Sequence, residues 1–214
     1  IVLDVQERRA LIQRQAEALA AKAGGRVLWN QELLDEVADL VEAPVAVLGS
    51  FPADALEVPQ PVLVASMEEH QRYFPVAGKD GRLLPKFVTI ANGVATAHVT
   101  AGNERVLKAR LADARFFFTE DRKHGLEVHG RRLDGVVWQA NAGSMADKAR
   151  RLEALAHWIA ARVGAREGVA CRAAELAKAD LVTHMVGEFP MLQGITGGLY
   201  AAADGEPAGV AEAI

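Results

Sequence analysis

The sequence of 214 residues has one cysteine, Cys171, and aromatic residues make up only 6% of it. A single cysteine excludes an internal disulfide framework and a zinc site built from several thiolates, and it fits a reducing cytoplasm. No apolar run approaches the length of a membrane span, and no secretory signal precedes the first predicted helix. We therefore expect a cytoplasmic protein that is not inserted in a membrane. Because the chain opens on Ile1, we also expect it to be a piece of a longer polypeptide.

The chain also lacks a strong excess of charge of either sign. The formal net charge is −4, so the overall charge gives no indication of a nucleic-acid partner. Any contact with RNA must come from a local basic patch. Half of the residues are hydrophobic and a quarter are charged, which is typical of globular domains rather than disordered chains.

The first part of the chain mixes helix and strand signals. Helices are predicted after Asp4 and after Asn30, since each residue can cap a helix whose apolar positions follow a helical period. Buried strands are predicted at 44–49, 74–77 and 83–91, and Lys79-Asp-Gly81 between the last two indicates a hairpin. A last short strand is predicted at 135–138.

The rest of the chain is predicted to be helical. Ser144 and Asp147 form a capping pair, and an apolar stripe is expected to face inward, consisting of Ala149, Leu152, Leu155, Ala156, Ile159 and Val163. Gly164 ends this helix, a second runs over about 169–186, and a third begins near Gly194. The sequence therefore predicts an α+β fold, with a domain boundary near residue 140.

A basic amphipathic helix is predicted to begin at Gly102. With about 3.6 residues per turn, one narrow sector must face a core, formed by Leu107, Leu111, Ala114 and Phe118. Arg105 and Lys108 point away from this sector and Arg115 flanks it. Such a ridge can follow a phosphate backbone. The alternative is a solvated helix face on which Glu104 and Asp113 pair locally with the cations.

Several other features carry weaker signals. His124 and His129 have a spacing that could hold a metal, but no third ligand is visible, so we favour a solvated or phosphate-contacting pair. The glycine-rich segment Gln193–Gly198 lacks the Gly-Lys-Ser/Thr ending of a phosphate-binding P-loop.

Five segments together resemble one family, the β subunit of the bacterial two-subunit glycyl-tRNA synthetase. These segments are 67–74 (MEEHQRYF), 87–93 (FVTIANG), 102–117 (GNERVLKARLADARFF), 178–190 (KADLVTHMVGEFP) and 188–194 (EFPMLQG). The resemblance covers almost the whole chain. It implies that residues 1–140 form a mixed α/β domain like the B3/B4 module of the phenylalanyl enzyme, and that residues 141–214 begin an HD-like helical domain.

The resemblance also implies a function. The chain would be a fragment of the non-catalytic β subunit of a glycine–tRNA ligase, recognising the acceptor arm of a glycine tRNA. The separate α subunit would activate glycine with ATP and Mg²⁺ in an α2β2 assembly, so no cofactor, catalytic residue or metal ligand is expected within this fragment. We expect contacts with the tRNA backbone from six residues: Arg72, Lys86, Arg105, Lys108, Arg115 and Lys178.

Two alternatives stay open. The HD-like half could be a metal-dependent phosphohydrolase, but Ala179 stands where that family has the histidine of its His-Asp pair, and alanine cannot bind a metal. His157 is expected opposite the apolar face of its helix, and Asp180 is expected to cap or pair within the fold. The other alternative is an assembly module that binds proteins and not RNA. Retained editing is not favoured, because a site sized for glycine already excludes larger amino acids.

Overall fold

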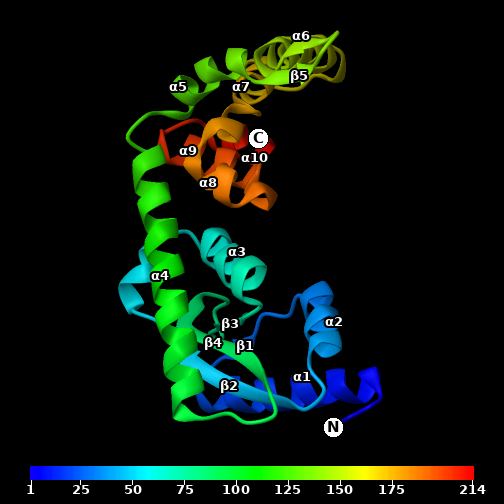
Figure 1. Cartoon of the computed structure of the whole chain (residues 1–214). Coiled ribbons are helices and arrows are strands. Elements are labelled where there is room, and N and C mark those ends of the chain that lie inside the picture. The colour runs from blue at the N-terminus through cyan, green and yellow to red at the C-terminus, as the bar shows by residue number, and fades with distance from the viewer. The chain divides into compact units, whose positions relative to one another are not determined.

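The computed structural model describes all 214 residues and combines helices with two antiparallel sheets (Figure 1). Contacts divide the chain into two compact units, Ile1–Arg115 and Phe116–Ile214. The mixture of helices and strands agrees with the predicted fold class. The division lies upstream of residue 140, where the sequence pattern changes. The assignment of the two parts to B3/B4-like and HD-like modules stays a prediction.

The first unit is built on a four-stranded antiparallel sheet with the order β1-β3-β4-β2. Its strands are β1 (Arg26–Val27), β2 (Pro44–Ser50), β3 (Phe74–Ala77) and β4 (Leu83–Asn92). The three strands predicted in this region are confirmed, and β3 and β4 form the predicted hairpin. The sequence did not predict β1, because two residues are too short to show a periodic pattern.

The helices of the first unit are α1 (Val5–Lys22), α2 (Gln31–Leu40), the 3-10 helix η1 (Ala53–Glu57) and α3 (Gln60–Gln71). The first two begin where the sequence places capping residues, whereas η1 and α3 each follow a proline and have no side-chain cap. The amide of Glu7 donates to Asp4 at 2.9 Å, and Asn30 accepts from the amides of Glu32 and Leu33. Both caps are as predicted. Apolar residues of α1, α2, β3 and β4 form one core, in which Ile12, Leu34 and Phe74 are fully buried.

The long helix α4 (Ala97–Asp121) begins in the first unit and ends in the second. Its predicted start at Gly102 is wrong. Thr96 caps the helix instead, since its hydroxyl accepts from the amide of Val99 at 3.3 Å. Gly102 is therefore an interior position of the helix.

The second unit contains short helices and one small hairpin. Its elements are α5 (Leu126–Gly130), η2 (Arg131–Gly135), β5 (Val137–Gln139), β6 (Gly143–Ser144), α6 (Met145–Val163), α7 (Glu167–Leu176), η3 (Ala179–Val182), α8 (His184–Glu188), η4 (Pro190–Leu192), α9 (Ile195–Ala203) and α10 (Ala208–Ala213). The capping box of Ser144 and Asp147 is confirmed at the start of α6. No helix of the chain combines the length and the apolar character that crossing a bilayer requires.

Two predictions for the second unit are wrong. The single helix predicted over 169–186 is divided into α7, η3 and α8. On α6, Ala149 is buried, whereas Leu155, Ile159 and Val163 are exposed rather than inward-facing.

Candidate functional site

The outward face of α4 in the first unit carries two cations, Arg105 and Lys108, which we call the α4 ridge. Leu107, Leu111 and Ala114 are between 0% and 2% exposed, which confirms three of the four residues of the predicted core-facing sector, whereas the fourth, Phe118, is half-buried. Both ridge residues are exposed, and neither pairs with a carboxylate. The ridge therefore presents two positive charges to solvent.

Polar contacts attach the first turns of α4 to the sheet. Glu104 accepts two hydrogen bonds from Ser50, one from its amide and one from its hydroxyl, each of 2.8 Å. The hydroxyl of Tyr73 donates to Asn103 at 3.0 Å. Ser50 is the cross-strand partner of Lys86 in the β2–β4 ladder. The structure therefore brings Lys86, which is half-buried and makes no ion pair, to the end of the sheet where α4 is attached.

Two other predicted RNA-contacting residues of this unit already bind carboxylates. Arg115 pairs with Asp54 at 3.1 Å and with Glu57 at 2.7 Å. Arg72 pairs with Glu36 at 2.6 Å from a left-handed backbone conformation, with φ of 55°, at the end of α3. A phosphate at either guanidinium would have to compete with these carboxylates, so we expect less affinity from them than from the α4 ridge.

The sixth predicted residue, Lys178, belongs to the second unit, where it is half-buried just before η3. Beside it, Ala179 and Asp180 are fully buried. One carboxylate oxygen of Asp180 accepts from the amides of Gly194 at 2.5 Å and Gly197 at 3.1 Å. These amides belong to the first turn of α9, so the prediction that Asp180 caps or pairs within the fold is confirmed.

The environment of Asp180 changes its acidity. Burial raises the pKa of its carboxyl above the ordinary 3.8, although the amide donors and Lys178 act in the opposite direction. Its other oxygen is buried and has no hydrogen-bond partner, which agrees with a net cost of ionising this group.

This shift predicts a dependence of stability on pH. A carboxyl with a higher pKa in the folded state binds its proton more tightly there, so the free energy of unfolding falls as pH rises from about 4 through the folded pKa. Asp180→Asn cannot ionise, so we expect the slope of its unfolding free energy against pH to be more positive than that of the wild type over this range. Urea unfolding at a series of pH values measures both slopes. Parallel profiles would contradict the assignment.

A second buried carboxylate, Asp121, was not predicted by the sequence. It accepts hydrogen bonds from the amides of His184 at 2.8 Å and Met185 at 2.9 Å, and from the Tyr200 hydroxyl at 3.0 Å. Burial and this nearby carboxylate raise the pKa of the Tyr200 phenol, so the phenol remains a donor. Asp121 thus joins the end of α4 to α8 and α9. Only its place at the end of a helix is visible in the sequence, and its partners lie at least 63 residues away.

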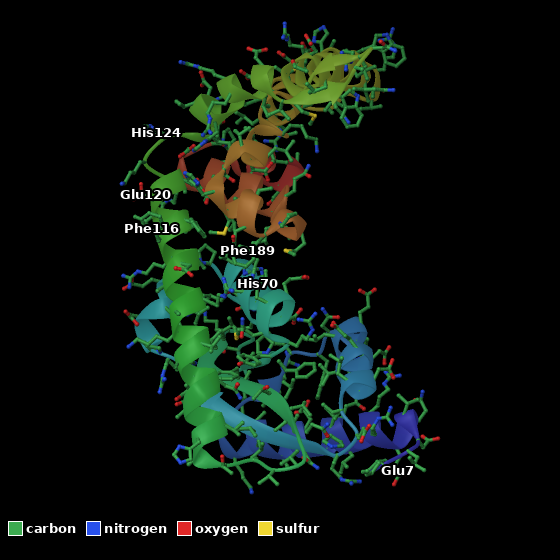
Figure 2. All side chains as sticks on the ribbon, viewed as in Figure 1. Glu7, His70, Phe116, Glu120, His124 and Phe189 are labelled. Atoms are coloured by element: carbon green, nitrogen blue, oxygen red, sulfur yellow. The ribbon has the colours of Figure 1, made fainter.

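The two histidines near the end of α4 differ in environment. His124 is exposed just beyond the helix (Figure 2), whereas His129 is buried in α5 and its Nε2 lies 2.9 Å from the carbonyl oxygen of Asp121. The interpretation of a solvated or phosphate-contacting pair is therefore wrong for His129. Nowhere in the 214 residues do three His, Cys, Asp or Glu side chains gather closely enough to hold a metal ion.

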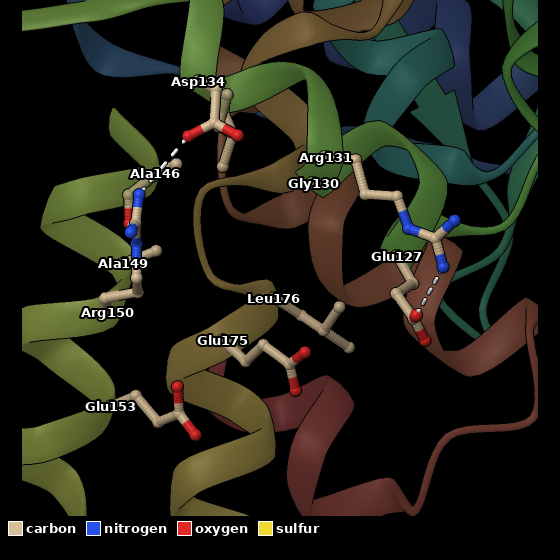
Figure 3. Close-up of a pocket in the computed structure, with 11 residues that line it drawn as sticks. Glu127, Gly130, Arg131, Asp134, Ala146, Ala149, Arg150, Glu153, Glu175 and Leu176 are labelled. Atoms are coloured by element: carbon tan, nitrogen blue, oxygen red, sulfur yellow. Dashed lines mark hydrogen bonds and ion pairs between the residues drawn. The ribbon is translucent and has the colours of Figure 1, made fainter. Parts of the chain in front are cut away.

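A cavity of about 310 Å³ lies in the second unit between α5, η2, α6 and α7 (Figure 3). Leu133 and Leu176 are among its apolar lining residues. Its charged lining residues are Glu127, Arg131, Asp134, Arg150, Glu153 and Glu175. Arg131 pairs with Glu127 and Arg150 pairs with Asp134, which leaves an excess of carboxylates. This cavity is therefore poorly suited to a phosphate group.

Comparison with known proteins gives a consistent result. The family model described as "Glycyl-tRNA synthetase beta subunit" matches residues 1–214. Relatives named "Glycine--tRNA ligase beta subunit" include those of Bacillus subtilis strain 168 (46% identity over 219 residues, 100% of this chain and 32% of the relative) and Nitratidesulfovibrio vulgaris strain Miyazaki F (50% over 214 residues, 99% of this chain and 30% of the relative). The relative of Pseudomonas syringae pv. syringae strain B728a is 47% identical over 216 residues, covering 100% of this chain and 32% of that protein. The chain thus spans about a third of the length of these curated relatives.

Proposed function

The chain belongs to the glycyl-tRNA synthetase beta subunit family, and from this membership we propose that it helps to bind a glycine tRNA for attachment of glycine. It acts as part of an aminoacyl-tRNA synthetase. The proposed role is to hold the sugar-phosphate backbone of the acceptor arm.

The observation that carries the proposal is the α4 ridge. Arg105 and Lys108 stand one turn apart on a helix whose opposite face is buried, so both positions are fixed by the fold. Because neither side chain is engaged by a carboxylate, a phosphate that binds there displaces only water and counterions. Lys86 at the nearby end of the sheet extends this positive surface.

The remaining predicted contacts have supporting roles in this proposal. Arg72 and Arg115 contribute when their carboxylate partners move aside, and Lys178 offers a contact from the second unit. None of these residues is assigned a catalytic step. Activation of glycine with ATP and Mg²⁺ is proposed for the separate α subunit, in an α2β2 complex.

We expect Arg105→Ala with Lys108→Ala to weaken tRNA binding and to lower the dependence of log K on log salt concentration by about 1.5, since each lost phosphate contact removes roughly 0.7–0.9 from the slope. Filter binding or fluorescence anisotropy from low to moderate salt, with the synthetase complex and a glycine tRNA, measures both quantities.

The matched control is Arg72→Ala with Arg115→Ala, which removes the same charge from cations that already have partners. We expect this control variant to lose less tRNA affinity than the ridge variant, and its slope of log K against log salt concentration to change less. If the control variant lost as much affinity as the ridge variant, the distinction between paired and unpaired cations would be wrong. An unchanged slope in the ridge variant would remove α4 from the tRNA interface.

A further inference from the structure

A cavity of about 250 Å³ lies in the first unit between η1 and α4, beside the α4 ridge. We call it the η1–α4 cavity. Its lining residues are Pro52, Asp54, Ala55, Lys108, Leu111, Ala112 and Arg115. Ala55 and Leu111 are buried, whereas Pro52 and Ala112 are exposed. The cavity is therefore apolar inside and can be reached from solvent.

The charged residues of the η1–α4 cavity divide it into two unlike ends. Lys108 is exposed and pairs with no carboxylate, so its end is cationic. Arg115 stands seven residues later on α4, which places it about 10 Å further along the helix axis. Its guanidinium faces two carboxylates, Asp54 at 3.1 Å and Glu57 at 2.7 Å, so this end has a net negative charge. Arg115 contacts one oxygen of Asp54, and the other oxygen can accept a hydrogen bond from a ligand.

The size and lining of the cavity select the kind of ligand. Its volume is below the roughly 300–1,000 Å³ of pockets that enclose drug-sized ligands, so it suits one planar ring. Apolar side chains such as Pro52, Leu111 and Ala112 can pack on the faces of a nucleobase that has left its stack. A phosphate joined to that base matches the cationic end at Lys108. Amino groups on the base edge match the carboxylate end at Asp54.

We propose that the η1–α4 cavity holds one unpaired nucleotide from the 3′ end of the tRNA acceptor arm. The inference rests on the proposed function, which places the acceptor arm along the α4 ridge. The phosphate of this nucleotide lies at Lys108, its base packs on Leu111 and Ala112, and an exocyclic amino group of the base donates to Asp54. Uracil has no amino group and would present a carbonyl oxygen to this carboxylate, so the cavity selects against uracil.

The test fills the cavity without removing a charge. Ala112→Leu adds bulk at an exposed position of the lining, and leucine is a good helix former, so α4 is retained. The matched control is Ala109→Leu, which adds the same bulk at an exposed position of α4 that does not line the cavity. Anisotropy measures the affinity of each synthetase complex for a glycine tRNA and for the same tRNA without its unpaired 3′ nucleotides.

We expect Ala112→Leu to bind the intact tRNA about tenfold more weakly than the wild type does, which is the effect of losing one base contact. Its affinity for the truncated tRNA should stay within about twofold of the wild-type value, and the control variant should change neither affinity by more than about twofold. Unchanged affinity of Ala112→Leu for the intact tRNA would overturn the proposal. An equal loss for both tRNAs would also overturn it, since the cavity would then not recognise the unpaired end.

A second measurement changes the RNA and leaves the protein as it is. Uracil is placed at each unpaired 3′ position in turn, and we expect the substitution at one position to weaken binding to the wild type by about tenfold. In Ala112→Leu the same substitution should have almost no further effect, because the contact is already lost. If no uracil substitution weakened binding to the wild type, selection by the base edge would be wrong.

These results distinguish the cavity from the proposed function. If the intact tRNA binds the wild type through the α4 ridge and Ala112→Leu shows no defect, only the cavity proposal fails. If the wild-type complex binds neither the intact nor the truncated tRNA, the proposed function fails, and the cavity proposal fails with it.

Discussion

Replacing Asp121 with alanine is expected to lower the free energy of unfolding of the second unit by about 4 kcal/mol, because three donors, two of them buried, lose their common acceptor. The donors are the amides of His184 and Met185 and the hydroxyl of Tyr200. Each unsatisfied buried group costs roughly 1–3 kcal/mol, and the two buried donors are the amide of Met185 and the hydroxyl of Tyr200.

Urea unfolding and hydrogen exchange measure this effect at two levels. The amides of His184 and Met185 should exchange much faster in Asp121→Ala than in the wild type, since their bonds to the carboxylate are gone. Asp204→Ala is the matched control, because Asp204 is exposed and accepts from a single amide, that of Leu126, so its loss should cost only about 1 kcal/mol. If the two variants lost the same free energy of unfolding, burial of the Asp121 carboxylate would not increase its contribution to stability.

The elements that follow from local chemistry were predictable from the sequence. Helix starts at Asp4, Asn30 and Ser144 depend on a side chain that binds an amide within three residues, which a pattern reveals. The same is true of the buried sector of α4, which needs only the helical period. The start of α4 was wrongly predicted at Gly102. A glycine inside a helix lowers its stability by about 1 kcal/mol, and here the hydrogen bonds made by Asn103 and Glu104 offset this loss.

The breaks in the second unit could not be predicted in this way. The segment 169–186 has helical periodicity, yet a new helix begins at His184. There Thr183 caps the amide of Val186, and Asp121, 63 residues earlier, accepts from the amides of His184 and Met185. The exposure of Leu155, Ile159 and Val163 on α6 also could not be predicted from the sequence. A periodic apolar face indicates burial against a partner, but the pattern does not say whether that partner lies in the same chain.

The charges of the candidate site were predicted only in part. The sequence gives the positions of Arg105, Lys108 and Arg115 around the helix, and these agree with the structure. It does not show that Asp54 and Glu57 come to Arg115 from η1, more than 55 residues earlier. The distinction between paired and unpaired cations is a tertiary property, and it is the distinction on which the tRNA-binding experiment depends.

A second large effect is expected at Gly49 in β2, where alanine should lower the free energy of unfolding by about 3 kcal/mol. The aromatic ring of Phe87, its partner in β4, lies directly over this glycine. A methyl group there would come within 3.0 Å of three ring carbons, closer than carbon atoms pack in proteins. The ring cannot easily move, since Phe87 is fully buried and stacks on Tyr73 with centroids 4.7 Å apart.

The matched control is Gly102→Ala, an interior position of α4 where an added methyl group meets nothing within 4 Å. That variant should gain about 0.5–1 kcal/mol, so alanine would have opposite effects at the two glycines. A double variant that also carries Phe87→Leu should recover part of the loss at Gly49, since the smaller side chain gives the methyl group room.

Gly49 precedes Ser50, whose amide and hydroxyl hold Glu104 on α4, so a strand displaced by the methyl group should also weaken tRNA binding through the ridge. Full stability of Gly49→Ala would show that the β2–β4 ladder can shift, and that this attachment of α4 to the sheet does not fix the positions of Arg105 and Lys108.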